Sequence, residues 1–254
     1  MVGGAVRHGL TSIGQDVIVY DVKLPQTSLK DVLGTELLFI SVPTHSNPDG
    51  TCNTSIVEGV VGDLAREGYK GLITIKSTVE PGTTDKLAKR YPALRLAFCP
   101  EFLRERAAYI DFIENNDVCI IGTYTKEDAD LLRDVHGSLP KNFDYVTPLE
   151  AEFAKYFINV FNALRIVFAN QFYDVAKAAG ADYTKIKEAI TKHRAVPPAY
   201  LDCNDNFRGF GGACLPKDSS AFALFAKKML GDTAPLNLFE GIVEINKRYK
   251  TTVL

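Results

Sequence analysis

Short apolar runs recur along the first half of the chain with helical patterns between several of them, and this alternation restricts the fold more than any other feature. Runs of four to six apolar residues bounded by turn signals are typical of buried parallel strands. Strands that alternate with helices predict a doubly wound parallel sheet of the α/β class. The runs are 37–41, 71–76, 94–99 and 118–122, and the helical patterns cover 54–67, 83–89 and 126–135.

The N-terminal stretch resembles part of a dinucleotide-binding unit. A helix is expected over 3–13, and a further apolar run, 16–21, ends in Asp21 and predicts another strand. In such units an acidic residue roughly 20 positions after the glycine turn binds a ribose, and Asp21 stands that far from Gly3. Only Val2 separates Gly3 from Met1, so we expect an N-terminally truncated Rossmann-like domain. A cap of the following turn is the alternative role for Asp21.

The second half changes to a helical pattern. Thr147, Pro148 and Glu150 form the signature of a capping box with proline at the first helical position. A long helix should begin there and end near Gly180, because glycine suits the position after a helix. We therefore predict two domains, with a Rossmann-like domain at 1–146 and an all-helical domain at 147–254. Further helices are expected over 182–191, 219–230 and 236–248.

The long helix carries two different stripes. Its aromatic stripe is expected in the core or at a subunit interface, and helix pairing between subunits predicts a homodimer. Its polar stripe has spacings of four and three residues, which place the side chains on one face. Buried polar groups without partners are costly, so we expect this face to meet a ligand. The aromatic stripe includes Phe153, Phe157, Phe161, Leu164 and Phe168, and the polar stripe consists of Lys155, Asn159 and Asn162.

The stretch 209–218, with the sequence GFGGACLPKD, is the strongest candidate for chemistry. Cys214 follows three glycines, which allow a ligand to approach the backbone closely. Lys217 and Asp218 stand where they can tune the charge of the thiol. Such a setting is typical of a nucleophile beside a polar substrate. Cys99 and Cys119, inside apolar runs, are instead expected to be core residues.

Composition excludes several function classes. The net charge of -2 provides no attraction for nucleic acid. No apolar run reaches the length of a membrane span, and no signal peptide is evident, so a cytoplasmic location is expected. Five cysteines lack the spacing of a disulfide framework or zinc site, so we predict no metal. His8, His45, His136 and His193 are expected at the surface or in loops.

Four stretches together resemble the UDP-glucose/GDP-mannose dehydrogenase family of NAD-dependent nucleotide-sugar 6-dehydrogenases. They occur in the order found in the family and cover most of the chain. They are KSTVEPGTT (76–84), CPEFLRERAAYIDF (99–112), EAEFAKYFINVFNA (150–163) and GFGGACLPKD (209–218). The resemblance implies that a primary alcohol is oxidised twice to a carboxylate, with NAD as cofactor. UDP-glucose is the implied substrate, and GDP-mannose is the alternative.

The resemblance also implies individual catalytic roles. The Cys214 thiolate would capture the aldehyde as a thiohemiacetal, and a second hydride loss would give a thioester that water cleaves. Lys155 would stabilise an oxyanion or relay a proton, and Asn159 would hold substrate or water. Glu101 would act as the base in hydrolysis, and Asp218 would orient the water or Lys155.

Binding residues follow from the same resemblance. The implied cofactor residues are Gly3, Asp21, Thr44, Thr78, Glu105 and Lys217, and the implied substrate residues are Glu101, Phe102, Leu103, Lys155, Asn159, Arg194, Phe210 and Gly211. Arg194 would reach a neighbouring subunit's site, although Ala195 and Val196 replace the usual Ile-Gly after it. The family continues into a third domain, so a nucleotide-sugar-binding remnant without activity is the second hypothesis.

Overall fold

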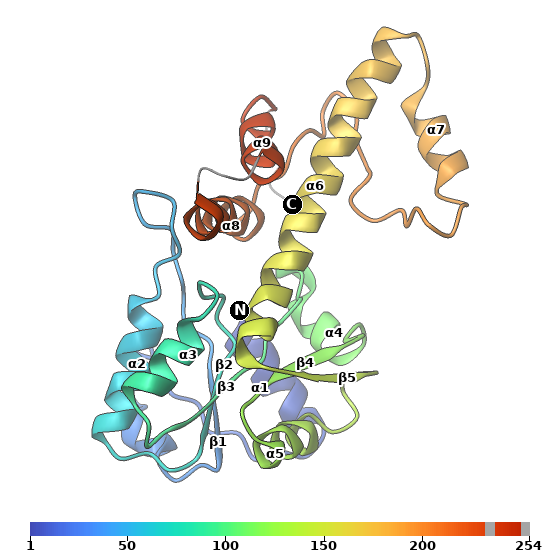
Figure 1. Cartoon of the computed structure of the whole chain (residues 1–254). Coiled ribbons are helices and arrows are strands. Elements are labelled where there is room, and N and C mark those ends of the chain that lie inside the picture. The colour runs from blue at the N-terminus through green and yellow to red at the C-terminus, as the bar shows by residue number, and fades with distance from the viewer. Residues whose placement is uncertain (232–236, 250–254) are drawn as a thin grey trace. The chain divides into compact units, whose positions relative to one another are not determined.

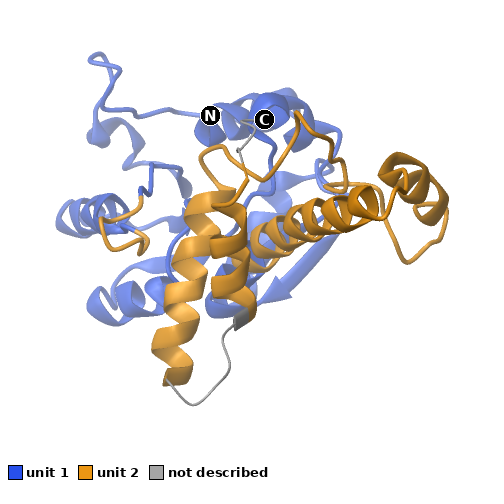
Figure 2. Cartoon of the chain, turned by 90° about the horizontal axis from the view of Figure 1, so that it is seen from above, with its two compact units in different colours: residues 1–45, 53–155 blue, residues 46–52, 156–254 orange. Residues whose placement is uncertain are grey.

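The computed structural model describes residues 1–231 and 237–249 and divides into two compact units. Unit 1 comprises Met1–His45 and Asn53–Lys155, and unit 2 comprises Ser46–Cys52 together with the residues from Tyr156 onward (Figure 2). The first two turns of the long helix thus group with unit 1. The domain boundary at 146/147 stays a prediction.

A five-stranded sheet forms the centre of unit 1 (Figure 1). Four of the strands confirm the strands that were predicted from apolar runs. The fifth strand, β5, was not predicted, because its residues are partly exposed and include Asp144. The strands lie in the order β1-β2-β3-β4-β5. They are β1 (Leu37–Ile40), β2 (Leu72–Ile75), β3 (Arg95–Phe98), β4 (Cys119–Gly122) and β5 (Phe143–Val146).

The predicted doubly wound sheet is parallel except at one strand pair. Neighbours pair in parallel except β3 and β4, which meet antiparallel at Phe98 and Gly122. A parallel connection needs a crossover, usually a helix packed on the sheet. The link from β3 to β4 instead holds the short helix α4 (Ala108–Ile113), which packs against α1 (Val2–Ser12).

Helices cover both faces of the sheet, as a doubly wound fold requires. One face packs its apolar side chains against α2 (Ser55–Arg66) and α3 (Thr83–Arg90), and the other packs against α5 (Lys126–His136). Side chains along β2 alternate between these two faces, since Ile73 packs in the cluster with α2 and α3 and Leu72 packs in the cluster with α5. Full burial of such side chains stabilises by roughly 1.5–3 kcal/mol each.

The segment 16–21 does not form the expected strand. Its side chains alternate between half-buried and exposed, and Ile18 is 50% exposed. Alternation marks an extended segment, but a strand also needs a neighbour to accept and donate its backbone hydrogen bonds. Within the described ranges no strand pairs with 16–21.

His136 is another correction, because it lies in the interior and not at the surface. It ends α5 and is 1% exposed. Its ring lies against Phe39 and Phe112, with centroid distances of 5.5 Å and 6.3 Å. Helical periodicity places it on the buried side of α5, one turn after Leu132.

Unit 2 is helical. The predicted capping box, which lies in the part of the long helix that groups with unit 1, is present, since Glu150 Oε2 accepts from Thr147 N at 2.7 Å and Thr147 Oγ1 accepts from Glu150 N at 3.3 Å. Gly180 has φ +77°, which confirms its place after the long helix. The predicted start of the last helix at residue 236 lies outside the described residues. The helices are α6 (Pro148–Ala178), α7 (Tyr183–Ile190), α8 (Leu215–Leu230) and α9 (Asn237–Asn246).

The aromatic stripe of α6 is not in the core of the chain. Phe157 is 73% exposed and Phe168 is 58% exposed. The buried face of α6 carries smaller or polar residues, such as Ala163, Asn159 and Asn162. An apolar pattern alone cannot identify that face, because close helix packing favours small residues and paired polar groups there. None of the described helices has the length and apolar content needed to cross a membrane.

Candidate active site

The glycine-rich loop before α8 is held by two asparagines of unit 2. Gly209 and Gly212 have φ of +68° and +76°, which glycine adopts without strain. The Gly209 N–H donates to Asn170 Oδ1 at 3.1 Å. The Asn246 amide accepts from Phe210 N at 2.8 Å and donates to Phe210 O at 2.9 Å. Neither asparagine was anticipated, because their positions 39 and 36 residues away give no local signal.

Cys214 stands at the N-cap of α8, directly after this loop. It is exposed, whereas the other four cysteines are buried. A helix N-terminus carries partial positive charge and stabilises an anion such as a thiolate. The helix begins four residues before the predicted start at Ser219, with Pro216 in its first turn. The structure therefore presents the predicted nucleophile at an anion-stabilising position.

Asn159 and Asp218, both predicted catalytic residues, lie in contact within unit 2. Asn159 Nδ2 donates to Asp218 Oδ2 at 2.5 Å, and the Asp218 carboxylate is 1% exposed. Lys217 Nζ donates to the other oxygen, Asp218 Oδ1. The first turn of α8 adds the favourable end of the helix dipole. This buried carboxylate consequently has a cation and an amide as partners.

In unit 1, Lys155 and Glu101 form a buried ion pair. Lys155 Nζ donates to Glu101 O at 2.6 Å and to Glu101 Oε1 at 3.2 Å, and the two side chains are 5% and 10% exposed. Glu101 Oε2 accepts from Leu103 N at 2.7 Å. Lys155 Nζ also lies 5.7 Å from the centroid of Phe102. A buried acid and base at hydrogen-bond distance can exchange protons with a substrate that displaces one of them.

The loop that carries Glu101 is anchored by Arg104 and Asp111. The Arg104 side chain and backbone N–H both donate to the Asp111 carboxylate. The side-chain hydrogen bond from Arg104 lowers the pKa of Asp111 to about 2. The predicted cofactor residue Glu105 is exposed in the short helix η2 (Glu105–Ala107) that follows. Leu103 is half-buried against the α1 cluster.

Glu152 holds the second loop of unit 1 and was missed by sequence reasoning. Its Oε1 accepts from Thr84 N at 2.8 Å and from Thr84 Oγ1 at 2.6 Å, and its Oε2 accepts from Gly82 N. These donors lie at the N-terminus of α3. Burial raises the pKa of Glu152 to about 7. The available signal was a carboxylate in an apolar helix, three residues before Lys155.

The residues near the start of α1 fit a phosphate-bearing cofactor. No side chain caps the N-terminus of α1, and a Cβ placed on Gly3 would lie 3.5 Å from Ser41 Cβ. Ser41 follows β1, and its buried Oγ has no hydrogen-bond partner. Helix N-termini at the carboxyl ends of parallel strands bind phosphates. An orphaned hydroxyl at this point suits a phosphate oxygen.

Other predicted binding residues are less closely grouped. Asp21 is exposed and its Oδ1 accepts from Lys23 N at 2.9 Å, as in a turn cap. Thr44 and Thr78 are half-buried in the loops after β1 and β2. In unit 2, Arg194 is exposed in the segment after α7, with no contact to the Cys214 loop described.

Two residues of the glycine-rich loop were predicted to bind substrate. The Phe210 side chain is 2% exposed and belongs to the core beside α6, so only its backbone borders the loop. Gly211 is half-buried. These positions are compatible with backbone contacts to a ligand, and the Phe210 side chain packs in the core.

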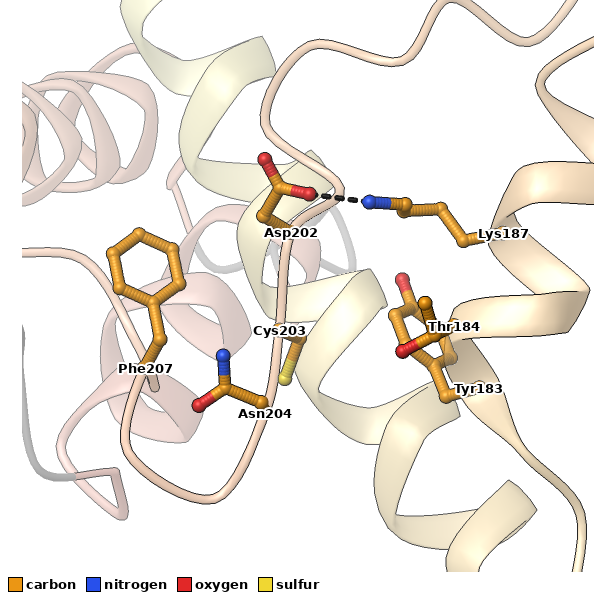
Figure 3. Close-up of a pocket in the computed structure, with 7 residues that line it drawn as sticks. All are labelled: Tyr183, Thr184, Lys187, Asp202, Cys203, Asn204 and Phe207. Atoms are coloured by element: carbon orange, nitrogen blue, oxygen red, sulfur yellow. Dashed lines mark hydrogen bonds and ion pairs between the residues drawn. The ribbon is translucent and has the colours of Figure 1, made fainter.

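A separate pocket of about 450 Å³ lies beside α7 in unit 2 (Figure 3). Its lining includes Tyr183, Cys203 and Asn204, and Lys187 pairs with Asp202 at its edge. None of the residues predicted for catalysis lines this pocket. The pocket is therefore distinct from the Cys214 loop.

Both halves of the chain match models of one protein family. Residues 6–139 match the model of the UDP-glucose/GDP-mannose dehydrogenase family, NAD binding domain, and residues 149–248 match the central domain of the same family. The chain is 31% identical over 229 residues to UDP-glucose 6-dehydrogenase of Rickettsia bellii, covering 86% of this chain and 50% of that protein.

Further relatives include enzymes named for a different sugar nucleotide. GDP-mannose 6-dehydrogenase of Pseudomonas aeruginosa is 30% identical, over 79% of this chain and 49% of that protein. A solved UDP-glucose dehydrogenase structure from Pyrobaculum islandicum superposes with a TM-score of 0.82 at 28% identity, covering 98% of this chain and 66% of that chain. The chain spans about half the length of the curated relatives it matches.

Proposed function

The chain belongs to the UDP-glucose/GDP-mannose dehydrogenase family, and we propose on that premise that it is an NAD-dependent oxidoreductase of nucleotide sugars. The reaction is oxidation of the C6 alcohol of the sugar to a carboxylate in two successive steps. The observation that carries the proposal is the exposed Cys214 at the N-terminus of α8. It directly follows a glycine-rich loop whose backbone is held by hydrogen bonds from asparagine side chains.

Cys214 acts as the nucleophile at the aldehyde stage. Its thiolate adds to the aldehyde carbon, and the carbonyl oxygen takes a proton to give a thiohemiacetal. Oxidation of this adduct leaves a thioester, and water then cleaves the C–S bond to release the carboxylate and the thiol. NAD, when bound, accepts the hydride at each oxidation.

Polar partners of each unit would support this chemistry. Asn159, fixed by Asp218, donates hydrogen bonds to substrate or water, and Asp218 orients the water. Lys155 stabilises developing negative charge on oxygen or relays a proton, and Glu101 is the base that activates water for hydrolysis. The direct Lys155–Glu101 hydrogen bond holds the two side chains together while substrate is absent.

The cofactor proposal uses residues at the carboxyl ends of the strands. The N-terminus of α1 at Gly3 and the unpartnered Ser41 hydroxyl would hold a phosphate of NAD. We retain the other predicted contacts as part of the proposal. These are Asp21, Thr44, Thr78, Glu105 and Lys217 for the cofactor, and Phe102, Leu103, Arg194 and Gly211 for the sugar nucleotide.

UDP-glucose is the proposed substrate, with UDP-glucuronate as product. The support is the name of the Rickettsia bellii relative, and GDP-mannose is the competing substrate because a relative named for it is almost equally identical. NADH absorbance with each sugar nucleotide in turn distinguishes them. We expect two NADH per UDP-glucose and a much slower reaction with GDP-mannose.

A cysteine pair provides the matched control. Cys214→Ala should abolish carboxylate formation, whereas Cys203→Ala removes a buried thiol of the same unit and should leave it. Carboxylate formed at the normal rate by Cys214→Ala refutes the assigned nucleophile. If no NADH forms while calorimetry still detects UDP-glucose, the chain is a nucleotide-sugar-binding protein and the oxidoreductase proposal is wrong.

We also propose that the protein is a homodimer through α6. The support is its exposed aromatic face, on which Phe157, Phe161, Phe168 and Phe172 are each at least 44% exposed. Contiguous exposed apolar side chains are typical of association surfaces. Sedimentation should yield a dimer at micromolar concentration, and Phe157→Ser with Phe168→Ser should yield a monomer. As a separate point, we propose that the protein is located in the cytoplasm.

A further inference from the structure

Two cysteines and a histidine meet in the interior of unit 1, on the face of the sheet that α5 covers. Cys99 follows β3, Cys119 begins β4 and His136 ends α5. One potential ligand atom from each residue lies within 4.8 Å of the other two, and all three residues are buried. The Cys99 and Cys119 Sγ atoms are 3.6 Å apart. Because the three come from separate elements, their spacing in the sequence gave no warning of the cluster.

The histidine is prepared to be a ligand. His136 Nδ1 lies 2.7 Å from the Leu132 carbonyl oxygen, which can only accept, so Nδ1 carries the proton in the neutral ring. The Nε2 atom then offers a lone pair, and it is buried without any hydrogen-bond partner. Metal-binding histidines characteristically donate their other N–H to a carbonyl or carboxylate in this way. Nothing in the proposed oxidation uses this ring.

We propose that Cys99, Cys119 and His136 bind a soft monovalent cation, namely copper(I). Thiolates select ions such as copper(I) and zinc, and imidazole suits both of these metals. At a metal–sulfur distance of about 2.3 Å, two sulfurs of a trigonal site lie about 4 Å apart. The two sulfurs are 3.6 Å apart, which is slightly less than that value. All three ligand atoms lie within 4.8 Å of one another. The two sulfurs would separate by a few tenths of an ångström on binding.

Charge and ligand number favour copper(I) over zinc. Lys76 is 3% exposed, and its Nζ donates to Cys99 Sγ at 3.2 Å. Two thiolates, the Lys76 ammonium and one monovalent cation sum to zero charge, whereas zinc leaves a buried positive charge, which is costly. Structural zinc sites almost always have four ligands, and the described residues supply three. On binding, the Cys99 and Cys119 thiols release any protons they carry to solvent.

The surroundings suit a dry, structural site. Phe39 and Phe112 line the histidine ring, and Lys76 Nζ lies 5.3 Å from the centroid of Phe39. A bound ion would connect the end of β3, the start of β4 and the end of α5. Glu101 lies two residues beyond Cys99, so the ion would also fix the base of the loop that holds the Lys155 partner.

The test uses the full chain with Cys214→Ala, so that the exposed thiol cannot bind metal. Copper(I) is delivered without oxygen from the complex with bathocuproine disulfonate, whose absorbance reports transfer to the protein. We expect one equivalent per chain, and at least tenfold weaker binding after Cys119→Ser or His136→Asn. Cys203→Ser, which removes a buried thiol of unit 2, is the matched control and should bind as tightly as its parent.

Thermal unfolding keeps the proposal testable if a variant folds poorly. Saturating copper(I) should raise the Tm of the parent and of Cys203→Ser, but not that of Cys119→Ala, chosen because alanine keeps the site apolar. Three results would each overturn the proposal: transfer of no copper to the folded parent, binding that ignores Cys119 and His136, or tighter binding of zinc than of copper(I). A Cys99–Cys119 disulfide in the freshly purified protein would overturn it as well.

Discussion

Replacing Glu152 by glutamine tests whether a buried carboxylate anchors the loop before α3. The wild-type carboxylate accepts from Gly82 N, Thr84 N and Thr84 Oγ1. Glutamine offers one acceptor oxygen and presents an NH₂ group to the remaining donor. A buried donor left without an acceptor costs about 1–3 kcal/mol. With a pKa of about 7, the Glu152 carboxyl is protonated at acidic pH and then also carries a donor hydrogen on one oxygen, so we expect Glu152→Gln and wild type to differ least in stability there.

Glu152→Gln should become the more stable of the two proteins as pH rises. The folded pKa of Glu152, about 7, lies above the unfolded value of 4.5, so the folded state binds the proton more tightly. Its contribution to the unfolding free energy is complete below the unfolded pKa and is lost as pH rises through the folded pKa. From about pH 5 to about pH 8 wild type should lose about 2.5 kcal/mol relative to Glu152→Gln.

Urea unfolding followed by circular dichroism at several pH values measures this difference. Glu150→Gln is the matched control on the same helix turn. The backbone hydrogen bond from Thr147 lowers the pKa of Glu150, so its titration falls below the window. This control should keep the wild-type slope between about pH 5 and about pH 8. Equal slopes for wild type and Glu152→Gln would refute the raised pKa and the reasoning built on burial.

Three further results are expected. Lys155→Ala should lower the free energy of unfolding by about 3–5 kcal/mol, measured by urea unfolding, because it leaves the Glu101 carboxylate buried without its cation. A loss below about 1 kcal/mol would contradict the buried ion pair. Iodoacetamide should alkylate Cys214 first in the native chain, as peptide mapping will show, and equal labelling of a second cysteine would contradict its unique exposure. Asp111→Asn should cost about 2 kcal/mol at neutral pH, since Arg104 holds the folded pKa of Asp111 below its unfolded value. That cost should shrink as pH falls from about 4 towards about 2, and a constant cost across this range in urea titrations would argue against the charge-assisted hydrogen bond.

Local patterns in the sequence determined much of the fold. The apolar runs predicted four strands, and the capping box at Thr147 predicted the start of α6, because both depend on residues within one or two turns. The motif around Cys214 identified the candidate nucleophile for the same reason. The segment 16–21 was predicted wrongly, since its alternation reports an extended chain but cannot report whether a neighbour is present.

Only the tertiary structure decided which distant groups meet. The Lys155–Glu101 pair joins residues 54 positions apart, and Glu152 reaches Thr84 across 68 positions. Cys99, Cys119 and His136 come together because β3, β4 and α5 lie next to one another in space. Periodicity shows which side of an element is apolar, but it does not show what that side faces. Partners of buried charges, and hence the pKa values that depend on burial, are set when the elements pack.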